Sequence, residues 1–161
     1  MNIFEFAQNL ERNHQDFYLE HAANTENKKL KIVFEDLAKE EKKHEQIIKN
    51  LSENKKGGEV ESDILPRAKK AFEEIAVDLK ENNEIQQQVD VYREAMEMET
   101  KAYNFYNEKQ EETDIKDVKE TFARLAKEEK KHEDILRNLM EMVNRPNTWL
   151  DDAEWYHREE Y

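Results

Sequence analysis

One segment of twelve residues occurs twice in this chain. Residues 34–45 read FEDLAKEEKKHE and residues 122–133 read FARLAKEEKKHE, so ten of the twelve positions are identical at an offset of 88 residues. The same offset maps Glu11 onto Glu99. The length of the chain is that of one domain. We therefore expect a single domain, residues 1–161, whose two halves carry the same set of functional side chains.

Composition and the spacing of apolar residues both predict helices. Charged residues make up 40% of the chain, and only two glycines and two prolines interrupt it. The hydrophobic fraction of 37% is low for a compact protein, but long helices that share one narrow apolar seam need few apolar residues. Steps of three and four residues between apolar side chains predict helices at about 3–24, 27–53, 66–81, 84–112 and 114–143.

The order of these helices predicts an all-α four-helix bundle. A helix of about 27 residues is roughly 40 Å long. The connection at about 53–84 contains both glycines and a short helix of its own, and it can run back along that length. Two helical hairpins joined by this long crossover then lie side by side. The aromatic tail at about 145–161 carries Trp149 and Trp155, which we expect to cover one end of the bundle or a partner subunit.

Each copy of the repeated segment contains the motif Glu-x-x-His on the apolar seam of its helix. Glu41 with His44, and Glu129 with His132, are three residues apart, so their side chains point the same way with Cβ atoms about 5–6 Å apart. A single motif of this kind on a charged helix is usually a coincidence exposed to solvent. Two copies in the same register, both on the seam, favour a binding site instead.

Two more glutamates, Glu11 and Glu99, lie on the seams of the other two long helices. A buried carboxylate must be paired, protonated or bound to metal. The lysines beside the motifs do not lie on the seam, so they cannot neutralise these carboxylates. Four negative charges would instead balance two divalent cations. Oxygen donors with two imidazoles suit iron or manganese better than zinc. The sequence therefore predicts a site for two metal ions with the ligands Glu11, Glu41, His44, Glu99, Glu129 and His132.

This combination of residues resembles the rubrerythrin branch of the ferritin-like superfamily, along all four long helices. The resemblance implies a ferritin-like bundle with two iron ions, for which manganese or zinc can substitute. It implies that Glu41 and Glu129 bridge the ions and that Glu11 and Glu99 bind one ion each. His44 and His132 would each supply one nitrogen. Tyr18 and Tyr106, which the repeat offset also relates, either donate hydrogen bonds to these carboxylates in support of catalysis or simply pack.

Two features differ from the family pattern. Rubrerythrins add a rubredoxin-like domain with four cysteines, and this sequence contains no cysteine. The electron donor is then a separate molecule, such as a rubredoxin-like protein. Rubrerythrins also carry an extra glutamate one turn after the terminal glutamate of the third helix, where this chain has Ala102. His14 occupies the corresponding place after Glu11, either as a seventh ligand, as a support for the ligands, or as a core residue.

The resemblance implies a non-haem di-iron oxidoreductase of the peroxidase or oxidase type. It would reduce hydrogen peroxide, or dioxygen, with external electrons in defence against oxidative stress. One alternative is oxidation and storage of ferrous iron in the manner of ferritins, and another is a structural helical module with a vestigial site. The net charge of −13 argues against nucleic acid as a partner. No apolar run is long enough for a membrane span, so we expect a cytoplasmic protein, which by analogy forms a homodimer.

Overall fold

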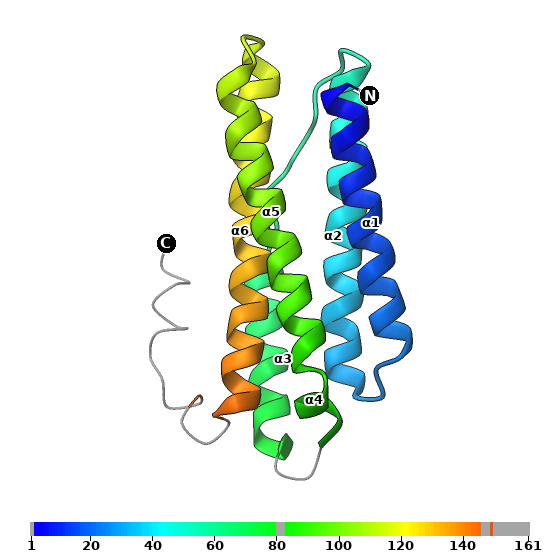
Figure 1. Cartoon of the computed structure of the whole chain (residues 1–161), viewed down its shortest axis with the longest axis vertical. Helices are drawn as coiled ribbons and strands as arrows, with labels where there is room; N and C mark the ends of the chain where they lie inside the picture. Colours follow the sequence, from blue (N-terminus) through cyan, green and yellow to red (C-terminus); the bar gives the residue numbers. More distant parts are fainter. Residues whose placement is uncertain (1, 80–82, 146–148, 150–161) are drawn as a thin grey trace.

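The computed structural model describes residues 2–79, 83–145 and 149, and every regular element in this part of the chain is a helix. Four long helices stand side by side as a bundle (Figure 1). The predicted all-α four-helix bundle is therefore confirmed. The helices are α1 (Ile3–Ala23), α2 (Lys28–Ser52), α3 (Ile64–Asp78), α4 (Asn83–Gln87), α5 (Val89–Glu112) and α6 (Lys116–Asn144).

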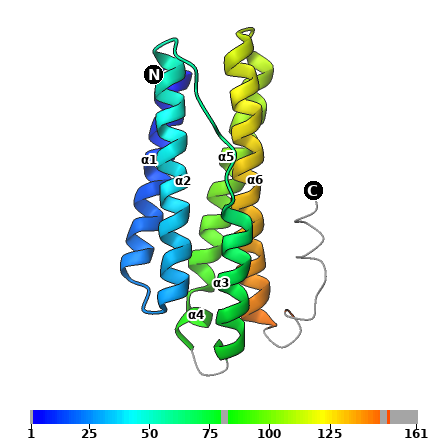
Figure 2. The ribbon, with the colours of Figure 1, turned by 180° about the vertical axis from the view of Figure 1, so that it is seen from behind.

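The bundle consists of two antiparallel hairpins. Helix α1 packs along α2, and α5 packs along α6. From the end of α2 the chain runs back along the bundle to α3, which packs against both α2 and α6 (Figure 2). This long crossover allows the second hairpin to begin at the same end of the bundle as the hairpin turn of the first (Figure 1).

Asparagine side chains fix the starts of the first two long helices. The side chain of Asn2 accepts a hydrogen bond from the backbone N–H of Glu5, and that of Asn27 accepts from Lys29 and Leu30. These bonds satisfy amide groups that have no partner within the helix. The structure therefore confirms the expected break between the first two helices, at about residues 24–27.

The second half of the crossover differs from the prediction. Helix α3 begins at Ile64, two residues before the expected start, and the single helix expected at 84–112 is interrupted at Gln88. The buried hydroxyl of Tyr92 donates a hydrogen bond of 2.9 Å to the carbonyl oxygen of Ile85. This bond satisfies a carbonyl group at the interruption and stabilises the separation of α4 from α5.

Two apolar clusters fill the bundle, and the predicted ligands lie between them along the chain. On α2, for example, Glu41 and His44 lie after Leu37, in one cluster, and before Ile48, in the other. The first cluster includes Tyr18, Phe34, Phe72, Tyr92 and Leu139, and the second includes Ala7, Leu51, Tyr106, Phe122 and Leu125. On α1, α5 and α6, too, the apolar residues before the ligands belong to one cluster and those after them to the other. Packing on both sides therefore positions the site.

The first part of the crossover is attached to α6. The backbone N–H of Ser62 donates to Glu128 Oε1 at 3.0 Å, and Arg124 donates two hydrogen bonds to the Glu61 carboxylate. The guanidinium of Arg124 lowers the pKa of Glu61 to about 2. A Cβ at Gly57 would lie 3.0 Å from Ile47 Cγ2, so a larger residue where the loop approaches α2 would require the side chain of Ile47 to shift.

The outer faces of the helices are charged. Arg67 of α3 lies 3.4 Å from Asp36 of α2, and Lys29 of α2 lies 2.6 Å from Glu74 of α3. Each such exposed pair contributes about 0–1 kcal/mol. In the part of the chain that the structure describes, no helix is both long and apolar enough to span a bilayer.

Of the predicted aromatic tail, the structure describes Arg145 and Trp149. Trp149 is buried, and its ring packs edge-on against Phe72 of α3 with centroids 6.4 Å apart. It therefore packs on α3, and the role of the tail in covering an end of the bundle or a partner subunit stays a prediction. Trp155 lies outside the described residues.

Candidate metal centre

The structure brings all six predicted ligands together in the middle of the bundle. The four glutamates have no exposed surface, and the two histidines are at most 1% exposed. One glutamate comes from each long helix, and α2 and α6 each add one histidine, because all six positions lie on the apolar seams. Their roles as ligands stay a prediction that metal binding tests. The six are Glu11, Glu41, His44, Glu99, Glu129 and His132.

One half of the cluster gathers around His44. Its Nδ1 atom lies 2.7 Å from Glu129 Oε1 and 3.7 Å from Glu11 Oε2. Glu11, Glu41, His44 and Glu129 each offer one donor atom, and these four atoms all lie within 4.8 Å of one another. This spacing is small enough for the four side chains to hold one metal ion.

The other half has the same arrangement, as the internal repeat predicts. The Nδ1 atom of His132 lies 2.7 Å from Glu41 Oε1 and 3.6 Å from Glu99 Oε2. Each histidine thus reaches across the bundle to the glutamate of the opposite motif. The rings of His44 and His132 are nearly parallel, with centroids 5.7 Å apart. The two halves are related by the approximate two-fold symmetry of the repeat.

A second set of donor atoms includes a histidine from outside the repeated motif. Atoms of His14, Glu41, Glu99 and Glu129 also lie within 4.8 Å of one another. The two sets share Glu41 and Glu129, the residues that the resemblance assigns as bridges. Two overlapping buried sets with two carboxylates in common fit a binuclear metal site.

The two tyrosines of the seam donate hydrogen bonds across the bundle. Tyr18 of α1 donates to Glu99 Oε1 at 2.6 Å, and Tyr106 of α5 donates to Glu11 Oε1 at 2.5 Å. Burial, and then the charges of the neighbouring carboxylates, raise the pKa of both hydroxyl groups well above its ordinary value. The hydroxyls therefore keep their protons at neutral pH and act as donors. Of the two alternatives left open by the sequence, this geometry favours hydrogen bonding over simple packing.

The four buried glutamates fall into two pairs whose pKa values are shifted in opposite directions, and their charged partners are histidines. Burial and the neighbouring carboxylates raise the pKa of Glu41 and Glu129 well above the usual range. Burial has the same tendency at Glu11 and Glu99, but hydrogen bonding within the cluster and the histidine charges lower their pKa overall. In the metal-free chain, burial and the neighbouring carboxylates thus favour the neutral form of the shared pair. Among the described residues, the ion pairs of these four carboxylates are with histidines and not with lysine or arginine.

The donor set fits two divalent cations. The Oε2 atom of each of the four glutamates is buried and has no hydrogen-bond partner among the described residues. Buried polar atoms in native proteins nearly always have a partner, and a metal ion would supply one. Four carboxylates match the charge of two such ions, and carboxylate with imidazole suits iron and manganese.

The last glutamate of the first repeated segment has a role that was not predicted from the sequence. Glu45 of α2 accepts hydrogen bonds from Arg12 at 2.6 Å and from Gln15 at 2.7 Å, both on α1. These bonds fasten the first hairpin one residue after His44. The ligands Glu11 and His44 are thereby held in register.

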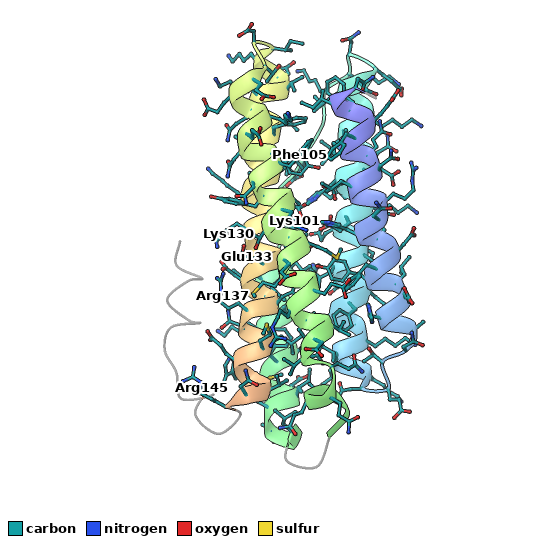
Figure 3. All side chains as sticks on the ribbon, viewed as in Figure 1. Lys101, Phe105, Lys130, Glu133, Arg137 and Arg145 are labelled. Atoms are coloured by element: carbon teal, nitrogen blue, oxygen red, sulfur yellow. The ribbon has the colours of Figure 1, made fainter. Side chains whose placement is uncertain are left out.

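Its counterpart in the second segment does the same for the other hairpin. Glu133 of α6 is buried and accepts a hydrogen bond of 2.6 Å from Thr100 of α5. Lys130 and Arg137 donate to it from neighbouring turns of α6 (Figure 3). Glu45 and Glu133 occupy the same position of the two repeated segments, and this agreement in the sequence indicated a shared role.

Replacing Tyr106 by Phe is expected to weaken metal binding by about 10-fold, within the range observed when a hydrogen-bonded support of a ligand is removed. The ring of Tyr106 would keep its packing against Phe122, 5.3 Å between centroids, so the fold should be unchanged. The measurement is a ferrous titration with a competing chelator. Tyr103→Phe is the matched control, since this tyrosine faces Lys130 and not the cluster. Unchanged iron affinity and turnover in Tyr106→Phe would show that the tyrosine only packs.

The comparison with known families agrees with this geometry. Comparison with curated proteins gives no match, and comparison with solved structures gives none either. A family model described as Rubrerythrin matches residues 2–140, which is most of the chain. The match covers three of the four long helices in full, α6 as far as residue 140, and every residue of the buried cluster. The chain therefore belongs to the rubrerythrin family.

Proposed function

We propose that this protein is a di-iron oxidoreductase that reduces hydrogen peroxide to water with electrons from a separate donor. The observation that carries the proposal is the pair of overlapping buried sets that share Glu41 and Glu129. Two ferrous ions bound there would supply the two electrons that cleave the O–O bond, and two protons complete the formation of two water molecules. Peroxide reduction is also typical of the family.

The residues of the chain provide the setting for this reaction. Two apolar clusters flank the site and keep bulk water away from it. Glu41 and Glu129 contact both halves and so hold the two positions close together. The hydroxyl protons of Tyr18 and Tyr106 stay on the tyrosines and orient Glu99 and Glu11.

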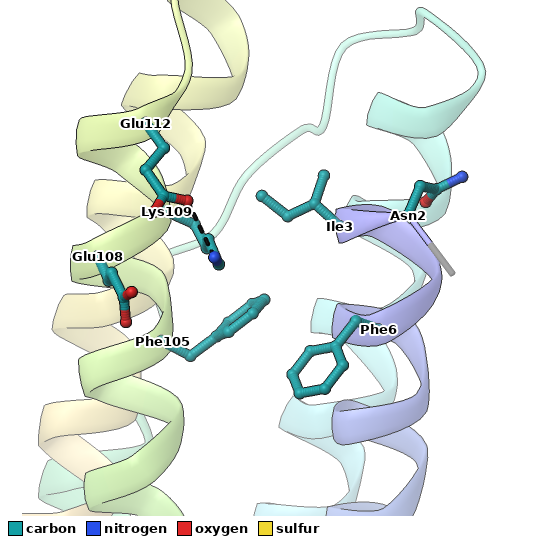
Figure 4. Close-up of a pocket in the computed structure, with 7 residues that line it drawn as sticks. All are labelled: Asn2, Ile3, Phe6, Phe105, Glu108, Lys109 and Glu112. Atoms are coloured by element: carbon teal, nitrogen blue, oxygen red, sulfur yellow. Dashed lines mark hydrogen bonds and ion pairs between the residues drawn. The ribbon is translucent and has the colours of Figure 1, made fainter.

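A small substrate can approach the site from the side of α1 and α5. A groove of about 530 Å³ is lined by Leu10, His14 and Phe17 of α1 and by Met98 of α5. A second groove, of about 480 Å³, lies nearer the start of α1, where Phe6 and Phe105 face each other (Figure 4). His14 lines the first groove and also belongs to the buried cluster, so we propose this groove as the route of the substrate.

The electrons must come from outside this sequence. It contains no cysteine and so cannot form the four-thiolate iron site that rubrerythrins use for electron transfer. We propose a separate donor, such as a rubredoxin-like protein, and a cytoplasmic setting for the exchange. A homodimer is our proposal for the assembly.

Anaerobic titration of the apoprotein with ferrous iron, followed by mixing with peroxide or dioxygen, tests this function. We expect about two iron ions per chain, fast oxidation by peroxide and slower oxidation by dioxygen, all recorded in the near-ultraviolet spectrum. A preference for dioxygen, with iron loading far beyond two per chain, would support ferritin-like storage instead. Absence of iron binding would contradict both functions.

A further inference from the structure

The two halves of the site differ at one pair of positions. The repeat offset maps His14 of α1 onto Ala102 of α5. Both side chains are buried, His14 with 5% of its surface exposed and Ala102 with none. One half therefore has an imidazole where the other has a methyl group.

The imidazole of His14 points into the half that contains Glu99. Its Nδ1 atom lies 3.4 Å from Glu41 Oε2 and 3.8 Å from Glu99 Oε1. Within the described part of the chain, this atom has no hydrogen-bond partner. A histidine that serves only the core would normally satisfy both ring nitrogens. Here the unsatisfied nitrogen faces Glu41 Oε2, a carboxylate oxygen that also lacks a partner among the described residues.

We propose that His14 is a third nitrogen ligand of the metal pair and binds the ion held by Glu99 and His132. The inference rests on the metal pair of the proposed function. The half with Glu99 then has three side chains of its own, and the half with Glu11 has two, Glu11 and His44. Both halves share Glu41 and Glu129. The two metal positions are therefore chemically different, and the position near Glu99 binds its ion more tightly.

The alternative role for His14 is a hydrogen-bond donor to Glu41, and the two roles place the ring proton on different atoms. A ligand nitrogen carries no proton, so Nδ1 would bind the metal and Nε2 would carry the hydrogen. A donor to Glu41 must carry the proton on Nδ1. The tautomer of His14 in the metal-loaded protein therefore decides between them.

The first experiment is nuclear magnetic resonance of the wild-type protein, labelled with ¹⁵N-histidine and loaded with Zn²⁺ as a diamagnetic substitute. The chain has five histidines, and His14→Ala identifies the signals of His14. We expect Nδ1 of His14 to be unprotonated and metal-bound, with the proton on Nε2. A proton on Nδ1 in the protein loaded with two zinc ions would overturn the inference and leave the metal pair intact. Failure to bind zinc and manganese at all would contradict the proposed function as well.

The second experiment compares Mn²⁺ binding in wild-type, His14→Ala and His21→Ala proteins. His21 lies two turns further along α1, against Phe17, and is the matched control. We expect two dissociation constants for the wild type, of which His14→Ala weakens the tighter by about 10- to 100-fold. The weaker constant, and both constants of His21→Ala, should stay the same. Equal weakening of both positions, or no change, would contradict the inference.

Discussion

Loading the apoprotein with ferrous iron or Mn²⁺ is expected to raise its melting temperature by roughly 10–20 °C. An ion that binds only the folded state, at a free concentration of about 100 times its Kd, stabilises that state by about 2.7 kcal/mol. Two ions contribute about 5 kcal/mol on this basis. For a chain of this size, each kcal/mol shifts the melting temperature by about 2–4 °C. Circular dichroism melts under anaerobic conditions measure the shift.

The shift should be reversible and should depend on the kind of ion. A chelator added to the loaded protein should return the melting temperature to the apoprotein value. Mg²⁺ is the matched control, because it prefers oxygen ligands and retains much of its water shell. A melting temperature that does not respond to iron or manganese would identify the bundle as a structural module with a vestigial site.

The parts of the fold that were predictable from the sequence depend on periodic burial. The steps of three and four residues placed Phe34, Leu37, Glu41, His44 and Ile48 on one face of a helix, and all five are buried. A seam of this kind constrains both the helix and its partners. The internal repeat then related the two halves, which is why all six predicted ligands meet.

The parts that were not predictable depend on single contacts between distant segments. The interruption at Gln88 is stabilised by the buried hydroxyl of Tyr92, and the period of the apolar residues continues through it. The crossover is fixed by contacts of Ser62 and Glu61 with α6, which no local pattern announces. The role of Glu45 required knowing that Arg12 lies opposite it.

His14 shows the limit most clearly. Its position one turn after Glu11 was visible in the sequence, and three roles were left open for it. The direction of its Nδ1 atom toward Glu41 and Glu99 depends on how α1 is rotated in the bundle. Only the structure supplies that rotation.

Replacing Glu129 by Gln is expected to stabilise the apoprotein at pH 7 and to abolish its stabilisation by metal. Burial and the charges of Glu11 and Glu99 raise the pKa of Glu129 in the folded state. A group with a raised pKa favours folding below its unfolded pKa, about 4.3 for glutamate, and this contribution is lost as the pH rises. Glutamine keeps the shape and can still form a hydrogen bond with His44, but it carries no charge. We expect a gain of about 1–3 kcal/mol at pH 7, which disappears near pH 4.

Metal binding should respond in the opposite direction, because the amide in the Glu129→Gln variant lacks the negative charge that both halves of the site use. Urea unfolding of the apoprotein at pH 4 and pH 7, with ferrous titration of the same samples, measures both effects. Glu128→Gln is the matched control: its side chain is also buried, but it accepts a hydrogen bond from Ser62 and lies outside both sets of donor atoms. This variant should retain two metal ions and lose apoprotein stability. Two tightly bound ions in Glu129→Gln would show that Glu129 is not a shared ligand.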